Sequence, residues 1–168
     1  YRLFVNELLK DERFDLEDRE KIKKNLQHFE ERRAYSFHIA KVLADFSQNL
    51  GLSGSFGRQV DFHEAGLLSI FEDEDFGRPE NIESILHGFE ALEKNFFDFF
   101  RKINQETKVF IGEENPIKDF KECTLIVSIY ESLEEKGLIG ILGPKRMNYL
   151  RNISLIKETK NLLENARE

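Results

Sequence analysis

The chain has 168 residues, of which 40% are hydrophobic, and this composition suits one compact domain or two very small ones. Its 25 basic residues are outnumbered by 32 acidic ones, so the net charge of −7 makes the chain a poor candidate for a main DNA-contacting surface. No apolar run reaches membrane-spanning length, no signal peptide is visible, and a single cysteine allows no internal disulfide, which together favour a cytoplasmic protein without a membrane partner.

The first third of the chain is predicted to be helical. Residues 1–10 form a short amphipathic helix, and a second helix follows over residues 14–35 with Asp15 as its N-cap. A third helical pattern spans residues 36–50 and is expected to stop at Gly51. The apolar positions of the three patterns are Tyr1, Phe4, Val5, Leu8, Ile22, Leu26, Phe29, Ile39, Val42, Leu43, Phe46 and Leu50. The second and third patterns are compatible with one bent helix or with two.

The middle third combines an irregular stretch with the strongest helical pattern. Residues 52–66 are rich in glycine and serine and predict a loop, with a brief strand around Val60 and Phe62. A short helical turn and an acidic loop follow, and Pro79 stands where a long helix begins. Its apolar stripe consists of Ile82, Ile85, Leu86, Phe89, Leu92, Phe96, Phe97, Phe100 and Ile103. This helix is expected to be the central packing element.

The last third changes to the period of β-strands. Residues 107–112 and 123–132 are strand-like, and a turn over residues 133–137 joins the latter to a strand over 138–142. A terminal helix is outlined by Ile153, Ile156, Leu162 and Leu163. Helices followed by hairpin-connected strands predict an α+β fold, helix-rich, with helices packed on a small antiparallel sheet.

Most of the reactive residues lack a pattern that would support catalysis or metal binding. The four histidines are scattered, the acidic run at residues 72–75 lacks the spacing of a calcium loop, and Ser53 and Ser55 form no nucleophile motif. Cys123 precedes a run of β-formers and is interpreted as a small buried hydrophobe rather than a catalytic thiol. We therefore predict no catalytic, cofactor-binding or metal-binding residue, and an enzyme is the least favoured class.

One motif of interest is the turn that follows the first C-terminal strand. It reads Gly112-Glu113-Glu114-Asn115-Pro116, in which Asn and Pro both favour turn initiation. Two adjacent carboxylates could act as a general acid and base, but consecutive residues normally point in different directions. A helix-capping turn is the simpler interpretation.

A second motif is GILGPKRMNY, which runs from Gly140 to Tyr149. Gly140, Gly143, Pro144, Lys145 and Arg146 have the outline of an anion-binding loop, but the spacing is not that of a Walker A loop and the proline removes a backbone donor. We therefore expect a strand-to-helix connection in which Gly143 and Pro144 form the corner.

The same connection is expected to contact its surroundings through two side chains. Arg146 and Tyr149 would tie the helix start to the sheet or to the neighbouring Gly112–Pro116 turn. An ion pair of Arg146 with Glu113 or Glu114 is the specific prediction.

These motifs, in this order, resemble the C-terminal region of the heat-inducible transcription repressor HrcA family. FIGEENP, CTLIVSIYE, IGILGPKRMNY and ISLI carry the resemblance, and YRLFVNELL, KVLADFSQNLGLSG and FHEAGLLSIFEDEDFGRPENI extend it over nearly the whole chain. The most specific part is G-P-x-R-M-x-Y, here Gly143, Pro144, Arg146, Met147 and Tyr149. One departure is Glu74-Asp75-Phe76, which lacks the proline of the family's Pro-Glu-Phe stretch.

The resemblance implies a repressor of chaperone genes that binds an inverted-repeat operator as a homodimer. Family members have an N-terminal winged helix, a GAF-like domain and an inserted dimerisation segment, and the chaperonin GroE is thought to keep the repressor active. The chain begins at Tyr1 rather than Met and contains no winged helix, so operator DNA would be contacted only through an upstream domain.

The expected domain organisation follows from the same resemblance. Residues 1–50 would lead from the missing winged helix, and residues 51–168 would form the GAF-like domain, in one compact unit with the helices. Ser53 to Asp61 occupies the place of the family's insert in only a few residues, which predicts a shortened variant. Alternative functions are a small-molecule sensor, motivated by Lys145 and Arg146 beside the turn, and a protein-interaction module without DNA binding.

Overall fold

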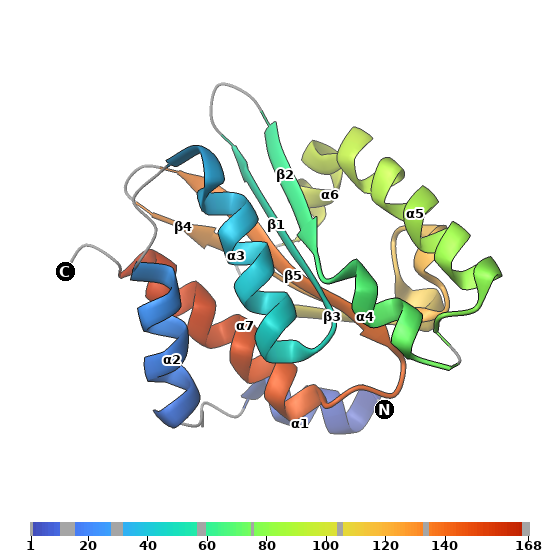
Figure 1. The fold of residues 1–168 in the computed structure, drawn as a ribbon, viewed down its shortest axis with the longest axis horizontal. Coiled ribbons are helices and arrows are strands. Elements are labelled where there is room, and N and C mark those ends of the chain that lie inside the picture. The colour runs from blue at the N-terminus through green and yellow to red at the C-terminus, as the bar shows by residue number, and fades with distance from the viewer. Residues whose placement is uncertain are drawn as a thin grey trace.

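The computed structural model describes residues 2–10, 16–27, 32–56, 60–74, 76–103, 106–132 and 135–165. Its centre is a five-stranded antiparallel sheet in the order β2-β1-β5-β4-β3 (Figure 1). The strands are β1 (Leu50–Phe56), β2 (Val60–Ala65), β3 (Lys108–Ile111), β4 (Cys123–Glu131) and β5 (Lys136–Pro144). The α-helices are α1 (Arg2–Lys10), α2 (Leu16–Gln27), α3 (Arg32–Ser47), α4 (Leu67–Glu72), α5 (Pro79–Lys94), α6 (Phe96–Lys102) and α7 (Tyr149–Glu164), with 3-10 turns η1 (Gly112–Glu114) and η2 (Lys118–Phe120). The predicted α+β, GAF-like fold with helices packed on an antiparallel sheet is confirmed.

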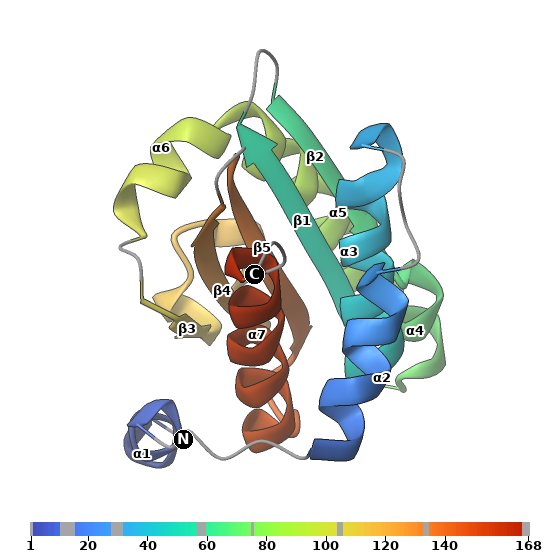
Figure 2. The same ribbon diagram turned by 90° about the vertical axis from the view of Figure 1, so that its left-hand side faces the viewer.

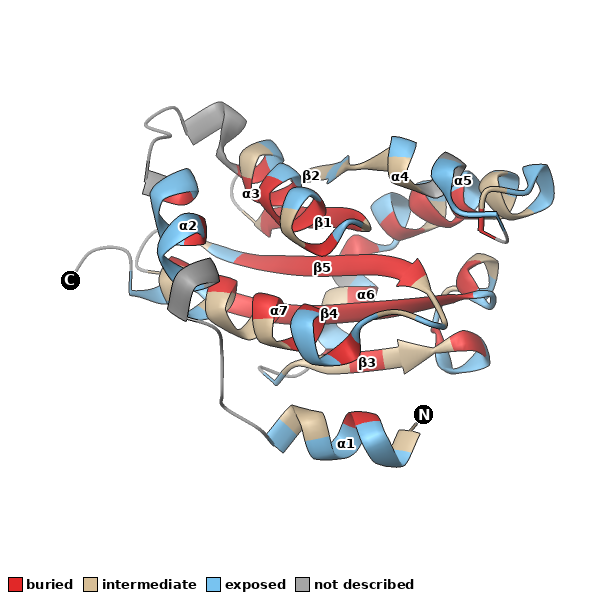
Figure 3. Ribbon diagram, turned by 60° about the horizontal axis from the view of Figure 1, so that its bottom comes forward, coloured by how far each residue is buried: buried red, intermediate tan, exposed pale blue. Residues whose placement is uncertain are grey.

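Helices cover both faces of the sheet (Figures 1 and 2). Because side chains alternate along a strand, β4 places Leu125 and Val127 in one hydrophobic cluster and Ile126 in the other. The first cluster is rich in phenylalanine from α5, α6 and η2, and the second joins the sheet to α1, α2, α3 and α7. Figure 3 shows β4 and β5 as buried strands between these layers. Three of the four α-helices in the second layer come from residues predicted to precede the domain.

The predicted helix stop at Gly51 is wrong. Of the prediction for residues 52–66, the loop is wrong, whereas the brief strand around Val60 and Phe62 is confirmed as β2. Helix α3 ends at Ser47, Gln48 turns the chain with a positive φ of 59°, and β1 and β2 form a hairpin. Gly51 and Ser53 of β1 face α3 and let the helix approach: a Cβ on Gly51 would lie 2.0 Å from the Ala40 carbonyl oxygen. Ser36 Oγ and Ser53 Oγ are 3.1 Å apart across the same interface. The glycine and serine residues that suggested a loop therefore allow close packing of α3 against β1.

The other helical predictions hold with two refinements. The second and third patterns are two helices, α2 and α3, while Tyr1, Asp15 and Phe29 lie outside the described residues. Pro79 occupies the first turn of α5 as predicted, but the long helix is broken at Asn95, whose φ of −110° and ψ of 24° separate α5 from α6. The predicted C-terminal hairpin of β4 and β5 and the terminal helix α7 are confirmed.

Candidate functional site

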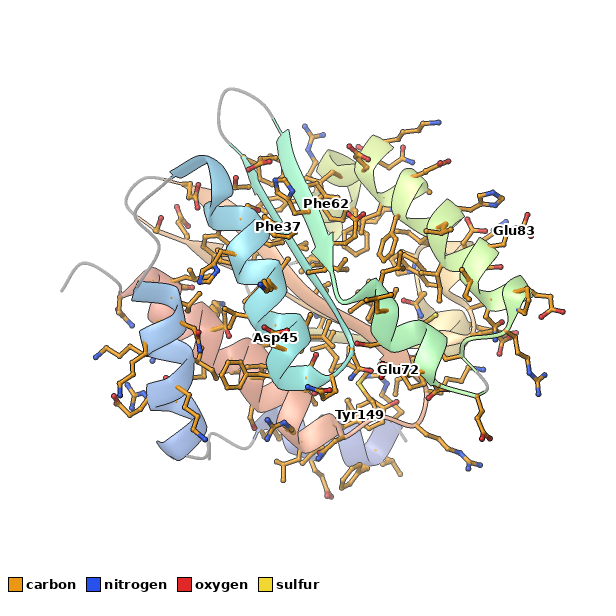
Figure 4. The ribbon with its side chains drawn as sticks, in the orientation of Figure 1. Phe37, Asp45, Phe62, Glu72, Glu83 and Tyr149 are labelled. Carbon is orange, nitrogen blue, oxygen red and sulfur yellow. The ribbon has the colours of Figure 1, made fainter. Side chains whose placement is uncertain are left out.

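The two motifs meet at one end of the sheet. β3 ends at Ile111, β4 begins at Cys123 and β5 ends at Pro144, so the turn after β3 and the connection after β5 lie around the start of β4. A Cβ on Gly112 would be 3.1 Å from Lys145 Cε, which places the two motifs in direct contact. We call residues 111–116 together with residues 143–149 the motif junction. Figure 4 shows Tyr149 at the start of α7, beside the end of β5.

The turn at 112–116 is built from short-range hydrogen bonds. Gly112 has a φ of +59°, a conformation that favours glycine, and η1 follows it. The Glu114 carboxylate bends back to accept the Ile111 N–H at 2.9 Å, and the Asn115 N–H donates to the Gly112 carbonyl at 3.1 Å. These contacts fit the interpretation as a capping turn, since Glu114 is engaged with the backbone while Glu113 is exposed.

Asn115 is the buried centre of the turn. Its side-chain NH₂ group lies 2.8 Å from the Gly112 oxygen, 3.1 Å from both the Phe120 and Cys123 oxygens, and 3.3 Å from the Phe110 oxygen. Four carbonyls therefore converge on one donor group, while Asn115 Oδ1 has no partner. The last pairing of β3 with β4 is Ile111 opposite Thr124, so Cys123 lies one residue beyond the β3–β4 ladder. Its carbonyl oxygen accepts a hydrogen bond from the Asn115 side chain instead of from β3. This residue joins β3, both 3-10 turns and β4.

Tyr149 makes the equivalent link for the second motif. Its hydroxyl donates to the Lys145 carbonyl and receives the hydrogen of Thr124 Oγ1 at 3.0 Å. Asn148 caps α7 by accepting the Arg151 N–H at 3.1 Å, as expected for an N-cap. The prediction that Tyr149 ties the helix start to the sheet is thus confirmed. The corner differs slightly from expectation, because β5 continues through Pro144 and the bend falls at residues 145–147.

The predicted ion pair of Arg146 does not form. Among the described residues, Arg146 is exposed and pairs with neither Glu113 nor Glu114, while Lys145 lies 3.5 Å from Glu122. Glu114 instead pairs with Arg2 through both of its oxygens. This contact lowers the pKa of Glu114, with the Arg2 side-chain hydrogen bond as the main cause. Sequence reasoning missed Arg2, since nothing local relates residues that are 112 positions apart.

Gly140, Gly143, Met147 and Pro116, the remaining predicted residues, make packing or hydrogen-bond contacts. A Cβ on Gly143 would lie 2.6 Å from Asn49 Oδ1, and one on Gly140 would lie 3.1 Å from the Ile126 carbonyl oxygen. Met147 Sδ receives the Asn152 side-chain N–H at 3.3 Å. Pro116 lines a shallow groove of about 310 Å³ between α5, α6 and η2.

The Cys123 thiol is held in its unreactive, protonated form. Burial raises the pKa of the Cys123 thiol to about 12, so it stays protonated near neutral pH. The described residues hold no group of three His, Cys, Asp or Glu side chains that could bind a metal ion. His63 Nε2 lies 2.6 Å from Asp61 Oδ1, a pair at the surface of β2. Within the described ranges, no helix is long and apolar enough to cross a membrane.

Comparison with known proteins gives a consistent family. The family model described as "HrcA protein C terminal domain" matches residues 2–153. "Heat-inducible transcription repressor HrcA" of Thermodesulfovibrio yellowstonii is 33% identical over 121 residues, which cover 70% of this chain and 33% of that protein. The protein of the same name from Carboxydothermus hydrogenoformans is 31% identical over 93 residues, covering 55% and 27% of the two chains. The chain thus spans about a third of the length of the curated relatives it matches.

A solved structure supports the fold alone. It is titled "Crystal structure of a hypothetical protein at 2.2 A resolution", and it has a TM-score of 0.71 at 14% sequence identity. The similarity covers 97% of this chain and 76% of that chain, so the whole arrangement of sheet and helices recurs there.

Proposed function

The chain belongs to the HrcA family, and from this premise we propose that it is the dimerisation and regulatory region of a heat-inducible transcription repressor of chaperone genes. The family match over residues 2–153 carries the proposal, since it includes both halves of the motif junction. In this role the chain is cytoplasmic and performs no catalysis. The exposed positions of Glu113 and Arg146 and the buried thiol of Cys123 agree with a binding role rather than an enzymatic one.

The mechanism we propose is alignment of two DNA-binding domains by a dimer. A dimer with twofold symmetry would position two upstream winged helices on the two half-sites of an inverted repeat. The net charge of −7 supports placing the phosphate contacts in that upstream domain. Heat would weaken operator binding by shifting the dimer equilibrium, for which a few kcal/mol suffice in a marginally stable domain. The chaperonin GroE would act on the same equilibrium as a modulator.

The test is operator binding by a longer protein that includes the winged-helix domain. Electrophoretic mobility shifts should show tight binding to the inverted repeat and much weaker binding to a single half-site, and light scattering should report a dimer. A half-site duplex of equal length is the matched control. Monomeric protein that binds both duplexes with equal affinity would contradict the proposal.

One observation favours a second candidate, a small-molecule sensor. The groove beside η2 has an apolar floor that includes Leu92, Phe99 and Ile117, and its rim carries Asp98, Lys102, Lys118 and Asp119. Charges of both signs around an apolar floor would suit a small zwitterionic ligand. A thermal-shift screen of metabolites and nucleotides should then give a stabilised transition for one class, and uniformly flat responses would count against the sensor.

A further inference from the structure

The sheet has an open edge at β3. This strand has four residues, stands last in the strand order and pairs only with β4 among the described strands. A free edge presents unpaired backbone groups, which proteins commonly cover to prevent unwanted strand addition. At β3 the cover comes from outside the sheet. Figures 2 and 3 show α1 next to β3, at the periphery of the fold.

The cover consists of the same two side chains that form the ion pair. Arg2 Nη2 donates to the Val109 carbonyl at 2.6 Å, and the Glu114 carboxylate accepts the Ile111 N–H at 2.9 Å. Arg2 and Glu114 are joined to each other by two contacts. The ion pair and the capped edge are therefore one arrangement, and loss of α1 would remove the Arg2 half of it.

The other end of α1 is joined to α7 by a polar contact. Lys157 of α7 donates from Nζ to the Leu9 carbonyl at the end of the helix. Between the two ends, Val5 is the one fully buried side chain of α1, with Leu8 and Leu9 partly buried beside it. Leu3 and Phe4 are 83% and 54% exposed. A nine-residue helix has little stability of its own, so these few contacts hold it in place.

Few buried contacts and half-exposed polar attachments characterise segments that open locally, before the rest of a domain unfolds. The side chains of Arg2 and Glu114 are 40% and 42% exposed. We propose that α1 is a releasable cap on the open edge of the sheet, held at its ends by Arg2 and Lys157, and that its release uncovers β3 while the sheet stays folded.

The cap has a consequence for any domain that precedes α1. While α1 is docked, that domain is held next to the sheet through α1, and when α1 is released it loses this attachment. Unlike the release itself, this consequence rests on the proposed function. The experiment below measures release in the chain alone, so its result is independent of whether the protein represses transcription.

The experiment is hydrogen exchange followed by mass spectrometry on the whole chain, with Glu114→Gln as the variant. Exchange in residues 2–10 and 108–111 should become about fivefold faster, the size expected for a half-exposed ion pair, while residues 123–131 and 136–144 should not change. Arg2→Gln should speed exchange in residues 2–10 by a similar factor without altering the Gly112–Pro116 turn, because the Ile111 N–H keeps its Glu114 acceptor in that variant. The control is Glu122→Gln, which removes the similarly exposed contact with Lys145 and should leave α1 unchanged.

Two results would overturn the proposal. If exchange in β4 and β5 rises in parallel with exchange in α1, the helix separates only when the whole domain unfolds. If neither Glu114→Gln nor Arg2→Gln changes exchange in α1, the ion pair does not hold the cap. Faster exchange of α1 in both variants, with β4 and β5 unchanged, supports it.

Discussion

Asn115→Ala should destabilise the protein strongly for a change of one polar side chain. The lost NH₂ group has two hydrogens shared among four carbonyl oxygens. The Gly112 oxygen retains the backbone N–H of residue 115, so the main losses fall on the Phe120 and Cys123 oxygens. A buried acceptor left without a donor costs about 1–3 kcal/mol, so two such acceptors give a loss of about 2–6 kcal/mol in the free energy of unfolding.

The assay is urea denaturation followed by circular dichroism, with two further variants. Asn95→Ala is the matched control, because the Asn95 amide donates to the Ala91 carbonyl at 3.0 Å in an exposed position; its cost should stay below about 0.5 kcal/mol. Asn115→Asp should cost more than Asn115→Ala at neutral pH, since it directs a carboxylate at carbonyl oxygens. Its folded-state pKa would be raised, so the stability of Asn115→Asp should recover as the pH falls. Equal losses for Asn115→Ala and Asn95→Ala would refute the assigned role of Asn115.

Three further changes test other parts of the structure. Gly51→Ala should lower the free energy of unfolding by about 1–3 kcal/mol or more, because its Cβ would strike the Ala40 carbonyl oxygen at 2.0 Å; wild-type stability in the same denaturation assay would contradict the close contact of α3 with β1. The Cys123 thiol, with its pKa raised to about 12, should react with a disulfide reagent only as fast as the protein unfolds, and rapid labelling of native protein would show that the thiol is accessible. Burial raises the pKa of Glu158 despite Arg19 Nε at 2.7 Å from its carboxylate, so the folded state binds this proton more tightly than the unfolded state does. The wild type should therefore gain stability relative to Glu158→Gln as the pH is lowered from neutral, and a pH-independent difference would contradict this.

The predictable parts of the fold are those in which a local pattern decides the structure. The β-branched residues over 123–132 and the turn before residue 138 predicted the β4–β5 hairpin, and apolar spacing predicted α1, α5 and α7. The β1 strand was missed because Gly51 and Ser53 are small so that α3 can pack closely, and local sequence does not reveal that α3 is the neighbour. The break at Asn95 leaves the apolar spacing intact, so periodicity gave no sign of it.

The candidate site divides in the same way. The link from Tyr149 to the sheet was predictable because the residue stands at a strand-to-helix connection, where a short reach suffices. We expected Arg146 to pair with Glu114 because the second motif was predicted to lie beside the Gly112–Pro116 turn. In the structure, Glu114 pairs with Arg2 from the opposite end of the chain. Long-range ion pairs between surface elements leave no local pattern, and only the folded arrangement identifies them.

The position of β5 between β1 and β4 also determines when the sheet can form during synthesis. Leu50 of β1 pairs with Leu142 of β5, so the ribosome must add about 90 residues before β1 receives its second neighbour. At about 5–20 residues per second this delay lasts roughly 5 to 20 s. Throughout that interval the edge of β1 that β5 later occupies has no strand to pair with. Every newly made copy therefore spends seconds with an incomplete sheet, a delay fixed by strand order rather than by the stability of the finished domain.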